Sequence, residues 1–234
     1  MNGHDFTLVG TSLAALPSGA LWWAAPQVLT VSDLHLGKSE RMARRGGTLL
    51  PPYDTAETLA RLEADVAATA ARTVICLGDS FDDEAAARAL PPAARERLLR
   101  LMAGRRWVWI AGNHDPGPAD LPGSHLGVLV EGPLTFRHIA EPGATGEVSG
   151  HYHPKARLRL GGRQLSRPCF LVDDARVILP AYGAYTGGLD ADAPALDGLM
   201  QGGASAILTG PRAVAVPMRP ARARAPRRRA GSVG

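Results

Sequence analysis

The sequence has little cysteine, no long apolar run and no basic N-terminal segment, and each absence argues against a class of protein. Only Cys76 and Cys169 occur in 234 residues, so two reduced, partly buried thiols are expected rather than a disulfide framework. No apolar run approaches the roughly 20 residues that span a bilayer. The N-terminus, MNGHDFTLVG, contains an acid and lacks the basic region of a signal peptide. The sequence therefore predicts a cytoplasmic protein with no membrane partner.

Acidic residues are also absent after Met218, where the basic charge of the chain is concentrated. Six arginines lie between Arg219 and Arg229, and removing their charge from the total of +4 leaves −2 for the residues before them. Prolines, alanines and arginines in this segment offer almost nothing to bury. We therefore expect a folded domain over 1–217 and a disordered arginine-rich tail over 218–234. The tail could be a solubilising terminus or an arm for DNA or another acidic partner.

Short apolar runs alternate with helical patterns in the first half of the chain, and strands dominate the second half. Strands are expected at 6–9, 20–23, 28–31, 73–77 and 106–110, then near 127–130, 134–138, 156–160, 169–172, 176–179, 205–208 and 213–216. Helical periodicity covers 54–71 and 91–102, and Asp54 with Glu57 resembles a capping box. Without an internal repeat or a linker before Pro217, the pattern predicts one α/β domain.

Polar side chains follow three of the expected strands directly. Asp33 and His35 follow the strand VLTV, Asp79 and Asp82 follow TVICL, and Asn113, His114 and Asp115 follow RWVWI. The carboxyl ends of parallel strands share one edge of a sheet, where ligands bind. Further along, His151 and His153 are two residues apart, which places them on one side of an extended segment.

These residue types suit a site for two metal ions. Oxygen and imidazole ligands without a thiolate favour Mn, Fe, Zn, Co or Ni over a structural zinc. A carboxylate on a short glycine turn, such as Asp79, can bridge two ions about 3.5–4 Å apart. Asn113 adds an oxygen without adding negative charge. Two divalent ions exceed the charge of Asp33 and Asp79, so the site would attract an anionic phosphate ester.

The order D-x-H, G-D-x-x-D, G-N-H-D, H and G-H-x-H, from Asp33 to His153, resembles the calcineurin-like metallophosphoesterase superfamily. The resemblance implies a four-layer α/β/β/α sandwich and two divalent transition-metal ions, manganese foremost. It assigns Asp33, His35, Asp79 and His153 to metal one, and Asp79, Asn113, His138 and His151 to metal two. It gives His114 a catalytic role at the phosphate, where this residue stabilises the transition state or protonates the leaving oxygen, and it makes Asp82 the residue that orients His114.

Three loops resemble more closely the bacterial ligase-associated DNA damage response endonucleases: DLHLGK at 33–38, the arginine-rich loop ending in LLPP at 49–52, and GAYTGGL at 183–189. This resemblance implies an endonuclease for single-stranded or flapped DNA in DNA repair, associated with an ATP-dependent DNA ligase and a helicase. The candidates for contacts with the phosphate backbone are Lys38, Arg41, Arg44 and Arg45. The subgroup often has GDxFH where Asp82 follows Phe81 here, so the contact to His114 can differ.

Each of these candidate residues also has a purely structural interpretation. Taken singly, Asp33, Asp79 and Asn113 could be turn or cap residues, and His138, isolated in LTFRHIA, could be an edge histidine. Asp115 fits a turn. The basic residues of 38–45 could form a solvated face, and GAYTGG a structural turn.

Three functions fit the sequence. The first is a phosphodiesterase acting on DNA, and the second is a phosphodiesterase or phosphatase for a small nucleotide that uses the same site. The third is a non-catalytic scaffold, against which the intact ligand set argues.

Overall fold

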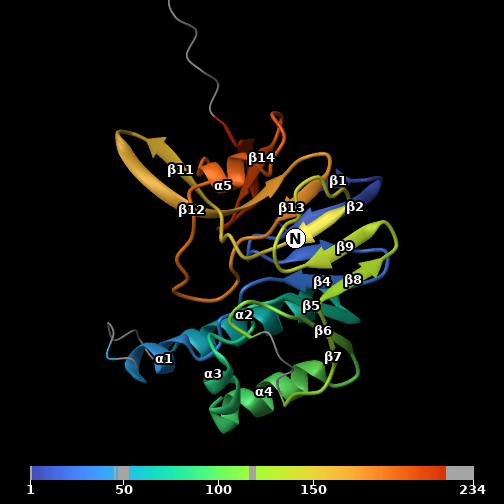
Figure 1. Cartoon of the computed structure of the whole chain (residues 1–234), viewed down its shortest axis with the longest axis vertical. Helices are drawn as coiled ribbons and strands as arrows, with labels where there is room; N and C mark the ends of the chain where they lie inside the picture. The colour runs from blue at the N-terminus through green and yellow to red at the C-terminus, as the bar shows by residue number, and fades with distance from the viewer. Residues whose placement is uncertain (1, 45, 47–52, 116–119, 220–234) are drawn as a thin grey trace, which may run out of the picture.

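Two β-sheets lie face to face, with helices against the outer face of the first and one short helix against the outer face of the second (Figure 1). The computed structural model describes residues 2–44, 46, 53–115 and 120–219. In Figure 1 the helices α2 and α4 lie below the first sheet, and α5 lies at the top against the second. None of the described helices combines the length and the apolar character needed to cross a bilayer.

The first sheet takes the N-terminal half of the chain, and its strands neighbour one another in sequence order. They are β1 (His4–Leu8), β2 (Thr11–Ala15), β3 (Leu21–Trp23), β4 (Val28–Val31), β5 (Thr73–Leu77), β6 (Arg106–Ile110) and β7 (Ser124–Leu126). The pairs from β1 to β4 are antiparallel, and those from β4 to β7 are parallel. Both faces of β4 and β5 are covered, which explains their continuous apolar sequences.

The second sheet has the order β15-β14-β12-β13-β10-β9-β8. Its strands are β8 (Val128–Glu131), β9 (Leu134–Arg137), β10 (Glu147–Ser149), β12 (Arg163–Val172), β13 (Arg176–Ile178), β14 (Ser205–Leu208) and β15 (Val214–Pro217). β10 is parallel to both β9 and β13, and the remaining pairs of this sheet are antiparallel. β11 (Lys155–Leu160) pairs with the outer part of β12 and forms a hairpin with it.

The helices are short except for two. They are α1 (Lys38–Arg44), α2 (Asp54–Thr69), α3 (Glu84–Arg88), α4 (Pro92–Met102) and α5 (Pro194–Asp197). α2 buries Leu59, Leu62 and Val66, the face that its sequence periodicity indicates. α4 contributes Leu98 and Leu101 to the same cluster, so the two helices cover one face of the first sheet together.

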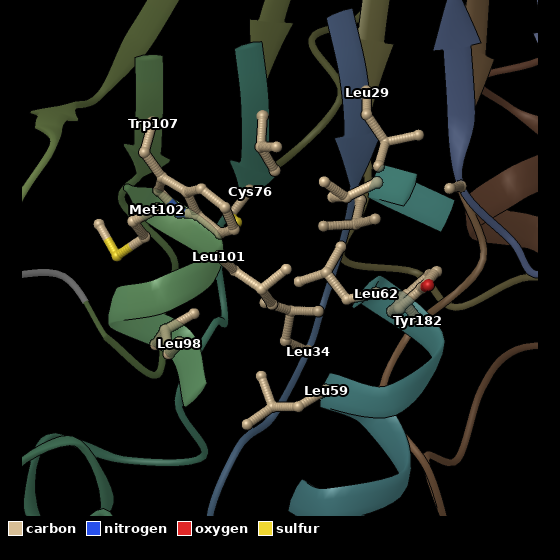
Figure 2. Close-up of a cluster of buried hydrophobic side chains, with 14 of the residues drawn as sticks. Leu29, Leu34, Leu59, Leu62, Cys76, Leu98, Leu101, Met102, Trp107 and Tyr182 are labelled. Atoms are coloured by element: carbon tan, nitrogen blue, oxygen red, sulfur yellow. The ribbon is translucent and has the colours of Figure 1, made fainter. Parts of the chain in front are cut away.

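Three hydrophobic clusters separate four layers. One lies between the helices and the first sheet, where Leu59, Leu62 and Leu98 approach Cys76 and Trp107 (Figure 2). A second fills the space between the sheets, and a third lies between the second sheet and α5. Successive residues of β5 alternate between the first two clusters, as the period of a strand requires. The predicted four-layer α/β/β/α sandwich is confirmed.

The expected capping box at the start of α2 is wrong. Tyr53 occupies the N-cap position and makes no side-chain cap bond. The buried carboxylate of Asp54 instead accepts hydrogen bonds from the backbone amide (3.1 Å) and the hydroxyl (2.6 Å) of Ser39. Asp54 therefore joins α1 to α2, a contact between distant residues that the local pattern could not indicate.

Both cysteines are buried thiols, as expected, and they lie in different layers. Cys76 belongs to the cluster under the helices and Cys169 to the cluster under α5. Burial raises the pKa of the Cys169 thiol to about 12 and raises that of Cys76 as well. Neither thiol is therefore ionised at neutral pH.

The first two residues of the expected tail are held against the body of the domain. Met218 is buried and donates its amide to the carbonyl of Ala204 (2.9 Å). Arg219 donates to the carboxylate of Asp197 (2.6 Å) and to the carbonyl of Met200 (3.0 Å). The rest of the expected tail, 220–234, lies outside the described residues.

Candidate metal centre

The polar strand ends of the two sheets meet at one edge of the molecule. β4, β5 and β6 are parallel neighbours, so the loops that carry Asp33, Asp79 and Asn113 leave the first sheet on the same side. The second sheet brings His138 from the end of β9 and His151 from the loop after β10. The loops of the two sheets are in direct contact at this edge, because the amide of His151 donates a hydrogen bond to Asp33 Oδ2 (3.0 Å).

Asp33, His35 and His153 form a first group of potential ligands. One ligand atom from each lies within 4.8 Å of the others, and His153 Nε2 is 3.1 Å from Asp33 Oδ1. Asp33 Oδ1, His35 Nε2 and His153 Nε2 are buried atoms, and the approach of His153 to Asp33 is the one polar contact of hydrogen-bond length that these three atoms make among the described residues. Three converging buried atoms whose hydrogen-bonding capacity is not filled are costly unless a cation joins them, so this group fits a metal ion.

Asp79, His138 and His151 form the second group, with Asn113 beside it. His138 Nδ1 lies 2.8 Å from the carbonyl oxygen of Leu77, an acceptor, so Nδ1 carries the proton. This tautomer leaves His138 Nε2 facing Asp79 Oδ2 (3.4 Å), Asn113 Oδ1 (3.0 Å) and His151 Nδ1 (3.2 Å). The isolated histidine of LTFRHIA is therefore turned into the site, and its donor set suits a transition-metal ion.

Five of the seven expected ligands have left-handed backbone conformations. They are Asp33 (φ 53°), His35 (45°), Asp79 (46°), His151 (73°) and His153 (47°). Such a conformation costs a non-glycine residue on the order of 1–3 kcal/mol and persists only where the surroundings enforce it. The fold thus spends stability on these loops in order to turn five side chains toward common points.

Glycines allow the closest approaches around these loops. A Cβ on Gly78 would lie 2.5 Å from the ring of His138, and one on Gly112 would lie 2.2 Å from Asp79 Oδ1. A Cβ on Gly150 would lie 1.7 Å from Ser32 Oγ and 2.6 Å from Asp33 Oδ2. The G-D, G-N and G-H pairs of the motifs therefore have a steric reason, because no larger residue fits beside each ligand.

Gly150→Ala tests this packing. We expect a loss of roughly 1–3 kcal/mol in the free energy of unfolding, the usual cost of overpacking, together with weaker metal binding at Asp33. Urea unfolding and metal analysis measure the two effects. Gly203→Ala is the matched control, because a Cβ there meets no atom within 4 Å. Equal stability and metal content in the two variants would contradict this account.

The surrounding charges favour ionised carboxylates. Burial opposes ionisation of Asp33, but contacts with His153 and His138 outweigh it and lower the pKa of the carboxyl. For Asp79, burial is likewise outweighed by His138 and the amide of His114, and the pKa falls well below its usual range. Both side chains are therefore available as anionic ligands across the physiological pH range.

Asp82 contacts both His35 and His114, through different groups. The Asp82 carboxylate accepts hydrogen bonds from His35 Nδ1 (2.9 Å) and Arg41 Nε, and these outweigh burial to give a pKa of about 2. The backbone carbonyl of Asp82, not its carboxylate, faces His114 Nδ1 (2.9 Å). Asp82 therefore fixes the orientation of His35 through its side chain and that of His114 through its main chain, a divided role that sequence alone could not indicate.

One of the basic residues that we expected to contact the substrate takes part in the hydrogen-bond network around Asp82. Arg41 pairs with a buried carboxylate, so it supports the His35 loop rather than standing free for phosphate. Lys38 is half-buried at the start of α1, and Arg44 ends that helix. Arg45 and the LLPP segment at 49–52 lie outside the described residues.

Two further residues brace the loops around the centre. Asp115 accepts hydrogen bonds from the amides of Ser80 (2.8 Å) and Phe81 (3.1 Å), so it ties the loop after β6 to the loop after β5. Burial first, and then Asp79, raises its pKa to about 6. Ser32, which the sequence reading missed, is fully buried and donates its hydroxyl to Asp33 Oδ2. Its position next to Asp33 is the one feature of the sequence that could have indicated this role.

Comparisons with known proteins agree with this geometry. The family model described as "Calcineurin-like phosphoesterase" matches residues 26–169, more than half of the chain. The crystal structure of Pseudomonas putida nuclease MPE is similar, with a TM-score of 0.68 and 31% sequence identity over 88% of this chain and 96% of that one. No curated protein gives a significant match. The motifs, the two-sheet fold and the paired ligand groups thus have one common explanation, which is that the chain belongs to the calcineurin-like phosphoesterase family.

Proposed function

We propose that this phosphoesterase uses two metal ions to hydrolyse phosphodiester bonds of DNA, with single-stranded or flapped DNA as its substrate. The observation that carries the proposal is the pair of ligand groups, each of which brings oxygen and nitrogen atoms from both sheets within 4.8 Å of one another. The similarity to a solved nuclease at 31% identity supports a nucleic-acid substrate. A DNA-repair setting in the cytoplasm, with an ATP-dependent DNA ligase and a helicase as associates, belongs to the same proposal and is supported by the resemblance of the loops.

The ligands divide naturally between two ions. Metal one would be held by Asp33, His35, Asp79 and His153, and metal two by Asp79, Asn113, His138 and His151. Divalent ions there would supply a Lewis acid for the phosphate oxygens and an activated water. We favour manganese, which the family resemblance implies and with which oxygen and imidazole ligands without a thiolate are compatible.

His114 has the position of a catalytic residue rather than a ligand. It follows Asn113 in the chain, and its side chain is exposed, unlike the buried ligands Asp33 and His35. The bond from Nδ1 to the Asp82 carbonyl fixes the ring and leaves Nε2 for the substrate. In the proposed reaction His114 acts as an imidazolium with both ring nitrogens protonated, and Nε2–H donates a hydrogen bond to the phosphate or passes its proton to the leaving oxygen. The Asp82 carboxylate holds the His35 ring in its tautomer.

Circular single-stranded DNA tests the proposal, because a circle offers no end to an exonuclease. In the presence of Mn²⁺ we expect the circle to be linearised and then shortened, with duplex DNA of the same sequence cut more slowly. Gel electrophoresis of the products measures both reactions. Hydrolysis of a small cyclic or linear nucleotide, with circular DNA left intact, would favour the small-nucleotide function over the DNA function.

A further inference from the structure

A basic hairpin leaves the metal centre directly after its last ligand. β11 begins at Lys155, two residues beyond His153, and returns as β12 from Arg163. No acidic residue occurs between Glu147 and Asp173, whereas this stretch contains Lys155, Arg157, Arg159, Arg163 and Arg167. We call residues 155–168 the arm. Its local charge is opposite in sign to the net charge of the domain before the expected tail.

The arm extends beyond the second sheet into solvent. Residues 163–167 are all exposed, whereas Cys169–Val172 of the same strand are buried. Consecutive residues of a strand point to opposite faces, so five exposed residues in a row mean that neither face is covered. Figure 1 shows β11 and the outer half of β12 projecting from the upper left of the molecule. A two-stranded ribbon contributes little stability of its own, so its charge pattern calls for a functional reason.

Part of the arm is attached to a second segment, the loop 183–189. Lys155 Nζ donates to the carbonyl of Thr186 (3.0 Å), and Arg157 Nε donates to Asp190 just beyond the loop (2.7 Å). In contrast, the exposed side chains of Arg163 and Arg167 have no ionic or hydrogen-bond partner among the described residues. These two guanidinium groups are therefore available to an anion from outside.

The loop 183–189 is fixed to the metal centre at both ends. The amide of Gly183 donates to the carbonyl of Asp33 (3.0 Å), and that of Leu189 donates to the carbonyl of Tyr152 (3.2 Å). Between these anchors Tyr185 is 46% exposed and has a left-handed backbone (φ 56°), an unusual conformation for a bulky residue. The fold thus holds an aromatic side chain at the surface, at a cost in strain, on a loop that touches the ligand loops.

We infer that a nucleic-acid single strand leaving the metal centre lies along this loop and the arm. Its phosphates would pair with arginines of the arm, and a base would stack on Tyr185. Basic side chains combined with an exposed aromatic platform are the usual means of binding single strands. An acidic protein would use the charge but has no need of the aromatic ring or of continuity with the ligand loops. This inference rests on the proposed function and assigns the path of its substrate.

The triple variant Arg157→Gln, Arg163→Gln and Arg167→Gln removes charge from both faces of the arm. With a single-stranded 30-mer, we expect kcat/KM to fall at low salt. The slope of log kcat/KM against log salt should flatten by up to about 2, since each phosphate contact contributes about 0.7. Tyr185→Asn, which tolerates the same backbone, should weaken strand binding by roughly 5- to 150-fold. Metal content and the rate on a small model diester report whether the centre is intact.

The control is Arg72→Gln, Arg100→Gln and Arg106→Gln, which removes the same charge at the amino ends of β5 and β6 and on α4. Arg72 and Arg106 stand at the amino ends of β5 and β6, and Arg106 pairs with Glu131 as Arg157 pairs with Asp190. This variant should keep the wild-type salt slope.

The outcomes separate the inference from the proposed function. Wild-type cleavage of the 30-mer with equal salt slopes in the arm and control variants would overturn the inference and leave the function standing. No wild-type cleavage, with the model diester hydrolysed, would overturn the DNA function. Binding of a phosphorothioate 30-mer then decides the inference: weaker binding by the arm variant supports it, and equal binding refutes it.

Discussion

Asp79→Asn is expected to abolish activity and to release metal from both ligand groups. Asp79 faces His138 of the second group, and in our assignment its carboxylate would be a ligand of both ions. Asparagine has nearly the same shape and accepts the left-handed backbone of this position, so the loss would come from the missing charge. Charge stabilisation by the ions accounts for several kcal/mol of the reaction barrier, which corresponds to a fall in kcat of about 10³-fold or more.

Elemental analysis after gel filtration and a diesterase assay measure the two effects together. Asp83→Asn is the matched control, because Asp83 is the N-cap of α3 and asparagine caps a helix equally well. We expect that variant to retain two ions and nearly full activity. A functional Asp79→Asn enzyme with two bound ions would show that the bridging role is assigned to the wrong residue.

His114→Ala is expected to keep both ions and to slow turnover by roughly 10²–10⁴, the scale of general acid–base groups. Its imidazole contacts the Asp82 carbonyl and approaches His35 at a ring distance of 5.3 Å, but it is not needed to complete either ligand group. If His114 protonates the leaving oxygen, the loss should shrink for diesters with acidic leaving groups, which need no proton. The rates of the wild type and the variant on nitrophenyl and alkyl diesters, together with the metal content of each protein, test whether His114 donates this proton.

His125→Ala provides the comparison for His114. His125 stacks on Trp109, at a ring distance of 6.3 Å, and lies outside both ligand groups. Its removal should leave the leaving-group dependence unchanged. Loss of a metal ion from His114→Ala, rather than a slower reaction with both ions bound, would place His114 among the ligands.

The sequence predicts many of the strands and helices of this fold, because strand and helix periods reflect which faces are buried, whereas the four-layer arrangement was implied by the family resemblance. β4, β5 and β6 begin and end at the predicted residues, and Leu59, Leu62 and Val66 lie on the buried face of α2. The polar residues after three parallel strands also meet as expected, since parallel strands bring their carboxyl ends to one edge. His138 was predictable only through the family motif, because a single histidine after a strand has no distinguishing pattern.

Contacts between distant residues were beyond the sequence. Asp54 looked like a helix cap and binds Ser39 instead, and the Asp82 carboxylate binds His35 and Arg41 rather than His114. The hydrogen-bond partner of each aspartate depends on which loop packs against it in the fold, and the periodicity of the local sequence does not indicate that loop. The arm escaped notice for a similar reason. Its basic residues are spread over two strands, and their exposure depends on β12 continuing beyond the sheet.

The distribution of the ligands between the two sheets has a mechanical consequence. Each ligand group takes residues from both halves of the sandwich, and the direct bond between His151 and Asp33 already joins residues 118 positions apart. An ion in either group would act as a cross-link across the seam, in a chain whose two cysteines are buried in separate layers. Since binding to the folded state alone stabilises it by about 2.7 kcal/mol at a hundred times Kd, metal supply would set the resistance of the whole domain to unfolding as well as its catalytic rate.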